Sequence, residues 1–217
     1  MGTAVAKGRL PRAFYDRPTL DVAEDLIGKV VAHNGPRGHR VSGVIVEVEA
    51  YIGESDPACH AAPGLTKRNA PLYGPPGVTY VYLNYGMHYL LNAVTEGEGR
   101  PAAVLIRAFS PLEGVSTMRR RRGGGNGRVP DEALGRGPGN VGKALGVSLR
   151  QNRLDLVQGP LVIEDWGWPR GPVSWGPRIG ITVGLDRPWR CWATNHPSVS
   201  GRTPRLRRHL PGPDWND

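Results

Sequence analysis

Apolar residues recur along the chain with two different spacings, which predict a mixture of short helices and strands. Residues 18–28 predict a helix, because their apolar positions repeat at helical spacing and Gly28 follows as a stop. Residues 29–33 predict a short strand, and the turn residues at 34–38 predict a hairpin with the next strand, residues 41–51.

Further elements follow the same two patterns. Strands are predicted at 78–82, 103–107, 161–164, 178–183 and 190–193, and helices at 111–122 and 140–145. The segment 119–131 is rich in Arg and Gly and is expected to be a mobile loop, and the basic, Pro-rich tail 201–217 need not be ordered. With no internal repeat and no linker, the sequence predicts one α+β domain over residues 1–217 with its core at 10–200. We expect a curved, largely antiparallel β-sheet flanked by helices.

The predicted strand 41–51 has two unlike faces. Successive side chains of a strand point to opposite sides, so one face is continuously apolar and the other carries Ile45, Glu47, Glu49 and Tyr51. Carboxylates beside a tyrosine are costly unless they are exposed, paired or functional. Two interpretations remain open from the pattern alone: an acidic outer face of a surface strand, or a catalytic site.

Length and composition exclude several classes of protein. The 217 residues fit one domain and need no disulfide or metal to stabilise their core. No apolar stretch approaches the roughly 20 residues of a membrane span, and the first residues have no signal-peptide core. Cys59 and Cys191 lie far apart without a CxxC motif, which argues against a disulfide scaffold or a zinc ribbon.

The net charge of +9 is unevenly distributed. Residues 1–99 contain nine Lys or Arg against ten Asp or Glu, whereas residues 100–217 contain nineteen against nine. This asymmetry is expected either for a solvated surface rich in arginine or for a polyanion-binding surface. Six of the seven tyrosines lie between Tyr51 and Tyr89, near the acidic pair, and could form part of the core or a surface for nucleobases.

Several common enzyme signatures are absent from the sequence. There is no GxSxG elbow, no P-loop and no GxGxxG between a strand and a helix. The zinc-deaminase pattern is also missing, and the scattered histidines do not form a local metal-ligand set. We therefore expect neither a metal nor a cofactor.

Five motifs occur in a fixed order along the chain: Val46–Tyr51, Ala58–His60, the long run Thr79–Asn92, Leu105–Arg107 and Gly137–Gly139. Together they closely resemble the alkyladenine (3-methyladenine) DNA glycosylase family. The match extends from Leu10 to Ser200, and an ordered set of motifs is far more specific than any single one.

This resemblance implies a single DNA glycosylase domain and a monofunctional DNA N-glycosylase of base excision repair. Such an enzyme flips alkylated or deaminated purines (3-methyladenine, 7-methylguanine, hypoxanthine or ethenoadenine type) out of double-stranded DNA. It hydrolyses the N-glycosidic bond with an activated water and leaves an abasic site. The resemblance implies Glu49 as general base, Arg107 as the residue orienting the water, and the backbone carbonyl of Ile179 as a further ligand of that water. We expect a monomer, cytoplasmic and associated with the bacterial nucleoid, without a membrane partner.

The resemblance also assigns a base pocket and a DNA wedge. Tyr51, Tyr82 and His60 would stack on the flipped base, Asn92 would crowd the 2-amino position of guanine, and Tyr85 would fill the gap in the duplex. Structural roles in the core or at a hairpin corner are the alternatives for the tyrosines, and a structural ion pair is the alternative for Arg107. Phosphate contacts are expected from the basic half, with Arg68, Lys143 and Arg119–Arg122 as candidates.

The sequence departs from the family pattern at Asn84, where an aliphatic residue is usual, and at His88, where an aromatic residue is frequent. Two other functions compete with the glycosylase hypothesis. One is a non-catalytic protein that binds single-stranded nucleic acid through stacked tyrosines. The other is a carbohydrate hydrolase using Glu47 and Glu49 as a pair, which is disfavoured because alternate strand residues lie only about 7 Å apart and point the same way.

Overall fold

The computed structural model describes residues 8–123 and 129–201, which form a single α+β unit. Its strands are β1 (Gly8–Arg9), β2 (Val30–Asn34), β3 (Arg40–Ile52), β4 (Thr79–Asn84), β5 (His88–Val94), β6 (Ala102–Glu113), β7 (Leu161–Asp165), β8 (Val173–Gly176) and β9 (Arg190–Ala193). Its α-helices are α1 (Arg12–Tyr15), α2 (Thr19–Leu26), α3 (Val115–Arg121) and α4 (Pro138–Leu145). Short 3₁₀ turns are η1 (Pro36–Gly38), η2 (Ala70–Tyr73), η3 (Asp131–Ala133) and η4 (Leu149–Gln151).

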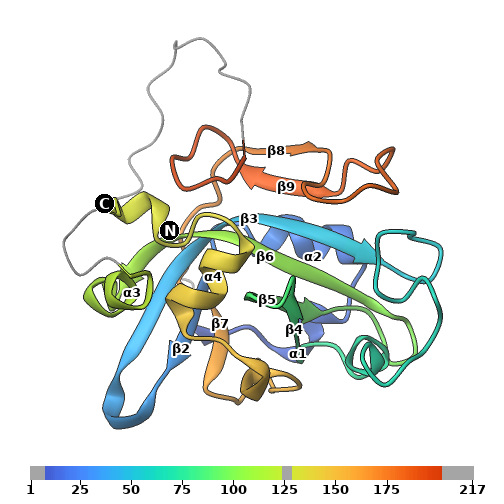
Figure 1. The fold of residues 1–217 in the computed structure, drawn as a ribbon, viewed down its shortest axis with the longest axis horizontal. Coiled ribbons are helices and arrows are strands. Elements are labelled where there is room, and N and C mark those ends of the chain that lie inside the picture. Colours follow the sequence, from blue (N-terminus) through green and yellow to red (C-terminus); the bar gives the residue numbers. More distant parts are fainter. Residues whose placement is uncertain (1–7, 124–128, 202–217) are drawn as a thin grey trace, which may run out of the picture.

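The nine described strands form one sheet, in which every strand pairing is antiparallel. The main path runs β1-β7-β2-β3-β6-β5-β4. Outside this path, β9 pairs with residues 47–49 of β3 on one side and with β8 on the other. In the view of Figure 1, α2 lies behind the long β3–β6 pair and α4 lies in front of it. The expected α+β fold with a largely antiparallel sheet and flanking helices is confirmed.

The helices form where the sequence offers an apolar stripe and a stop. In α2 the buried side chains are Thr19, Val22, Ala23 and Leu26. Helix α4 buries Val141, Gly142, Ala144 and Leu145, and it ends at Gly146, whose left-handed backbone closes the helix. Gly142 permits a very close approach of α4 to the sheet, because a Cβ atom there would lie 2.1 Å from the carbonyl oxygen of Tyr89 on β5.

β3 and β6 are the longest strands, and their pairing is irregular both at Ser42–Gly43 and around Glu47. The register shifts between Ile45 and Glu47 and shifts again between Glu47 and Val48. As a result Val46 has no partner on β6 and Arg107 has none on β3. Such bulges redirect side chains and are frequent beside functional sites. The second irregularity lies where β9 also pairs with β3, opposite Glu47, Val48 and Glu49.

Two predicted elements are corrected by the structure. The helix expected over 111–122 begins only at Val115, because β6 continues to Glu113 in pairing with β3, and Gly114 then turns the chain with φ 71°. The strand expected over 178–183 is an irregular segment, and the strand lies earlier, in β8. In addition, the run 79–92 forms a complete hairpin, β4 and β5, where only the first strand was predicted.

The segment expected to be a loop, 119–131, includes the last turn of α3, while residues 124–128 lie outside the described residues. The basic tail from 202 onward also lies outside them. No helix in the described part of the chain is long and apolar enough to cross a bilayer.

Candidate active site

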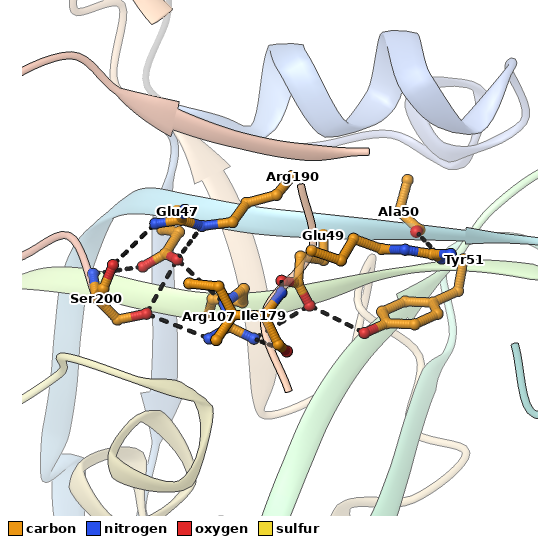
Figure 2. Close-up of polar contacts among 9 residues, drawn as sticks. Glu47, Glu49, Ala50, Tyr51, Arg107, Ile179, Arg190 and Ser200 are labelled. Atoms are coloured by element: carbon orange, nitrogen blue, oxygen red, sulfur yellow. Dashed lines mark hydrogen bonds and ion pairs between the residues drawn. The ribbon is translucent and has the colours of Figure 1, made fainter. Parts of the chain in front are cut away.

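Glu49 lies in the middle of β3 and is completely buried. Its carboxylate accepts hydrogen bonds from Tyr51 Oη (2.9 Å), Arg107 Nη1 (3.1 Å) and the backbone N–H of Ile179 (2.6 Å), as Figure 2 shows. Arg107 Nη1 also lies 3.4 Å from the carbonyl oxygen of Ile179, to which it donates. The structure thus brings together Glu49, Arg107 and Ile179, three residues from distant parts of the chain.

Glu47, two residues earlier on the same strand, is also completely buried and has its own set of hydrogen-bond donors (Figure 2). Its Oε1 atom accepts from Arg190 Nε (2.7 Å), Ser200 Oγ (2.9 Å) and Arg107 Nε (3.0 Å), and its Oε2 accepts from the Ser200 N–H (2.6 Å). Arg107 therefore bridges the two carboxylates. The acidic face of β3 is not a solvated surface, since residues 179 and 200 close over it.

Burial raises the pKa of the Glu49 carboxyl above its ordinary value. The positive charge of Arg107, the Ile179 N–H and the Tyr51 hydroxyl all favour the ionised form and oppose this rise. The pKa of this carboxyl is thus set by burial, which raises it, against hydrogen bonds and a positive charge, which lower it. Such opposing effects are frequent at catalytic acids and bases.

A pocket of about 330 Å³ lies in front of Glu49. Its wall includes the three residues that bind this carboxylate, namely Tyr51, Arg107 and Ile179. The remaining wall is mainly aromatic and aliphatic, with His60, Tyr82 and Asn92 among the lining residues. A small apolar core cluster of Cys59, Ala61, Leu72, Tyr80, Val94 and Ala103 supports it from beneath. The volume and the lining are typical of a site for a small, flat ligand.

Hydrogen bonds fix the polar groups of this pocket. Asn92 Nδ2 donates to the carbonyl oxygen of Tyr80 (3.0 Å), so its Oδ1 atom remains available as an acceptor. His60 Nδ1 lies 2.8 Å from the Tyr80 hydroxyl, and its ring meets Tyr82 edge to face at 4.4 Å. Burial and the neighbouring Arg68 lower the pKa of His60, which favours the neutral imidazole. Tyr80 is itself buried and supports the pocket from the core.

Tyr85 lies at the tip of the β4–β5 hairpin, at the rim of the pocket, and is 81% exposed. Tyr85 (φ 49°) and Gly86 (φ 68°) both have left-handed backbones, and Met87 N–H donates to Asn84 O (3.1 Å), as in a type I′ turn. Asn84 also lines the pocket, and His88 is its cross-strand partner. The two positions that depart from the family pattern are therefore neighbours beside the exposed tyrosine.

The candidate phosphate-binding residues have different surroundings. Arg68 is exposed and lies over the Tyr82 ring at 5.8 Å, and Lys143 is exposed on α4, whose first residue lines the pocket. In the arginine cluster Arg119 pairs with Asp131, and Arg121 donates to the Ala144 carbonyl. Lys143 and Arg68 are thus exposed beside the pocket, whereas three residues of the cluster have protein partners, since Arg120 also donates to Thr117 Oγ1.

Sequence reasoning did not single out Arg190 or Ser200, the other partners of Glu47. One sequence feature pointed to such partners. Two carboxylates on a strand that is buried on both sides require more than one cation, and the basic half of the chain is the source of these cations. Both cysteines are buried and free, and no cluster of three or more His, Cys, Asp or Glu suited to a metal ion occurs among the described residues.

Comparison with known proteins identifies the family of this chain. The family model described as methylpurine-DNA glycosylase (MPG) matches residues 13–197. A protein of Methanocella arvoryzae is 48% identical over 199 residues, covering 90% of this chain and 97% of that protein. Relatives from Chlorobaculum parvum (44% identical, 88% and 90% covered) and Burkholderia lata (43% identical, 90% and 93% covered) carry the same name, "Putative 3-methyladenine DNA glycosylase". The chain therefore belongs to the methylpurine-DNA glycosylase family and is a DNA N-glycosylase, a hydrolase of base excision repair.

Proposed function

We propose that this enzyme removes alkylated and deaminated purines from double-stranded DNA by hydrolysis, as a monofunctional glycosylase acting as a monomer. The substrates belong to the 3-methyladenine, 7-methylguanine, hypoxanthine and ethenoadenine type. The observation that supports this most is the buried carboxylate of Glu49 directly behind an aromatic pocket, with Arg107 and Ile179 forming the wall between them.

In the proposed reaction the flipped purine lies in the pocket between Tyr51 and Tyr82. The bond between the sugar C1′ and the base nitrogen breaks, and its electron pair leaves with the base. Water attacks C1′, and Glu49 accepts the proton that this water loses. A purine alkylated at N3 or N7 carries a positive charge and leaves as a neutral base, so it needs no proton from the enzyme. Hypoxanthine and ethenoadenine are neutral in the duplex, so each leaves as an anion and takes its proton from solvent.

Arg107 and Ile179 suit the task of holding that water. The Arg107–Ile179 contact of 3.4 Å is the longest in the cluster, and a water that enters between them can accept from the guanidinium and donate to the carbonyl and to Glu49. Because Arg107 is fixed by Glu47 on its other side, its position does not depend on the substrate.

Strand cleavage through a Schiff base would need an amine at the reacting carbon. No lysine occurs among the described residues that line the pocket, which supports hydrolysis by water alone. Tyr85, exposed at the rim, is proposed to enter the gap that the flipped nucleotide leaves in the duplex.

The test uses Glu49→Gln, with Glu54→Gln as control, since Glu54 is an exposed carboxylate on the turn after β3. Duplexes with a single hypoxanthine or ethenoadenine are incubated with each protein and then treated with alkali. We expect strand breaks only after alkali with wild type and Glu54→Gln, and lesion binding without base release by Glu49→Gln. Base release by Glu49→Gln at the wild-type rate would refute the role of Glu49. Breaks without alkali would refute the monofunctional mechanism.

A further inference from the structure

Arg178 is a charged residue that does not line the pocket and yet lies at the centre of the site's scaffold. Its side chain is completely buried together with that of Asp56, and the two form a bidentate ion pair with distances of 2.6 and 2.8 Å. Its guanidinium also stacks on the Tyr51 ring at 4.7 Å. Buried ion pairs are a weak means of gaining stability, so a pair of this kind beside an active site calls for a functional explanation.

The guanidinium connects parts of the chain that would otherwise be independent. Nη1 donates to the carbonyl oxygen of Ala50 (3.1 Å), which is the residue between Glu49 and Tyr51 on β3. Nη2 donates to the carbonyl oxygen of Gly184 (3.3 Å), which draws the segment 178–184 into a closed loop. Asp56 is held in turn by the N–H groups of Ile52 and Ala58, which flank the turn that follows β3.

The loop that Arg178 holds has few other attachments. Among the described residues, no backbone–backbone hydrogen bond joins residues 177–183 to the sheet. The Ile179 N–H donates to the Glu49 side chain, and Arg178 is the residue immediately before it. The position of the Ile179 peptide against Glu49 therefore depends on where the Arg178 side chain is anchored.

We propose that Arg178, anchored by Asp56, is a positioning residue that holds the Ile179 backbone against Glu49 and Arg107. This inference rests on the proposed role of Glu49 and adds a residue that touches neither the base nor the water. The guanidinium suits this task because its planar donors reach Asp56, Ala50 and Gly184 at once, whereas a lysine ammonium cannot pair bidentately or stack in the same way.

Loss of this anchor has an electrostatic consequence that mere loosening of the fold would not have. The Ile179 N–H lowers the pKa of Glu49, partly offsetting the effect of burial. When that hydrogen bond is lost, the pKa of Glu49 rises further. The acidic limb of the pH–rate profile should then move to higher pH, because a base must be ionised to act.

The test compares Arg178→Lys and a double variant, Arg178→Met with Asp56→Asn, with the control Arg187→Gln. The double variant removes both charges, so no unpaired buried charge remains to unfold the protein. Arg187 is a matched control, because it also approaches Asp56 (3.7 Å) and stacks on Trp189 but has no contact with Ala50 or Tyr51.

Single-turnover base release and lesion binding are measured for each protein from pH 5 to 9. For both Arg178 variants we expect release to slow roughly 10- to 100-fold, the size of effect that misplacement of a catalytic group produces, with lesion affinity retained. The acidic limb of the pH–rate profile should move to higher pH in both Arg178 variants, and the profile of Arg187→Gln should match that of wild type. An unmoved limb in the Arg178 variants would overturn the proposal.

A second readout does not depend on catalysis. In the free protein the chemical shift of the Ile179 amide should follow the titration of Glu49 through their 2.6 Å hydrogen bond, and this response should disappear in the Arg178 variants. Retention of the response in those variants refutes the positioning role. Absence of base release by wild type refutes instead the proposed function, so the two failures are distinguishable.

Discussion

Replacement of Glu47 by glutamine should cost the protein much of its stability, although Glu47 is not the proposed base. The Glu47 carboxylate is fully buried and accepts four hydrogen bonds, two of them from guanidinium groups. Three donors converge on Oε1 and one on Oε2, so a glutamine amide must direct its NH₂ group at the Ser200 N–H or at the two arginines. In either orientation the NH₂ group faces an N–H donor of the protein. Because the amide is neutral, the positive charges of the two arginines also lose their buried carboxylate partner.

Removal of one partner from a buried ion pair typically costs about 3–5 kcal/mol. For a chain of this length that corresponds to a decrease in Tm of roughly 6–20 °C. We expect urea unfolding of Glu47→Gln to show this loss, with Glu54→Gln unchanged as an exposed control. A loss below about 1 kcal/mol would show that Glu47 does not organise the arginines, and would contradict the view that Arg107 is fixed independently of the substrate.

Three further predictions test the site and its scaffold. Tyr85→Gly should leave stability within about 1 kcal/mol of wild type, because the side chain is exposed and glycine suits the left-handed φ, but should slow base release from duplexes at least tenfold and not from single strands. Equal slowing on both substrates would contradict the wedge. Gly142→Ala should destabilise by about 1–3 kcal/mol, measured by thermal unfolding against Gly97→Ala, where a Cβ atom meets nothing closer than 3.7 Å. Because the folded pKa of Glu49 is raised, the native state binds the proton more tightly than the unfolded state, and stability relative to Glu49→Gln should fall as pH rises from about 4.3 through the folded pKa. A relative stability that increases over that range would contradict the raised pKa.

The sequence was sufficient to predict those parts of the site that lie on regular strands. Alternation along β3 places Glu47, Glu49 and Tyr51 on one face, and the apolar run before Arg107 predicts the strand that carries this arginine, although β6 continues to Glu113. The run 79–92 carries Tyr82 and Asn92 to the pocket because both positions belong to the same face of one hairpin.

The remaining contacts depend on long-range pairing that no local pattern contains. Ser200 reaches Glu47 across 153 positions, and β9 joins β3 only because the chain returns to it after the rest of the sheet is complete. The segment 111–113 shows why local spacing can mislead: Leu112, Val115 and Met118 have helical spacing, but pairing of β6 with β3 takes precedence up to Glu113. Residues 178–183 resemble a strand in composition, but the backbone N–H and C=O of Ile179 bind the side chains of Glu49 and Arg107.

The left-handed turn that carries Tyr85 has a consequence for the way the enzyme finds damage. A non-glycine residue in this conformation costs about 1–2 kcal/mol, and that cost is met when the protein folds. The hairpin tip therefore has its shape before any nucleic acid arrives, and the wedge role proposed for Tyr85 requires no ordering of the loop. An enzyme that slides along intact duplex must test one base pair after another and leave each of them quickly. Under the proposed wedge role, a tip that is already shaped would allow each of these encounters to be brief. The time spent at a site would then be set by how readily its base leaves the stack and not by rearrangement of the protein.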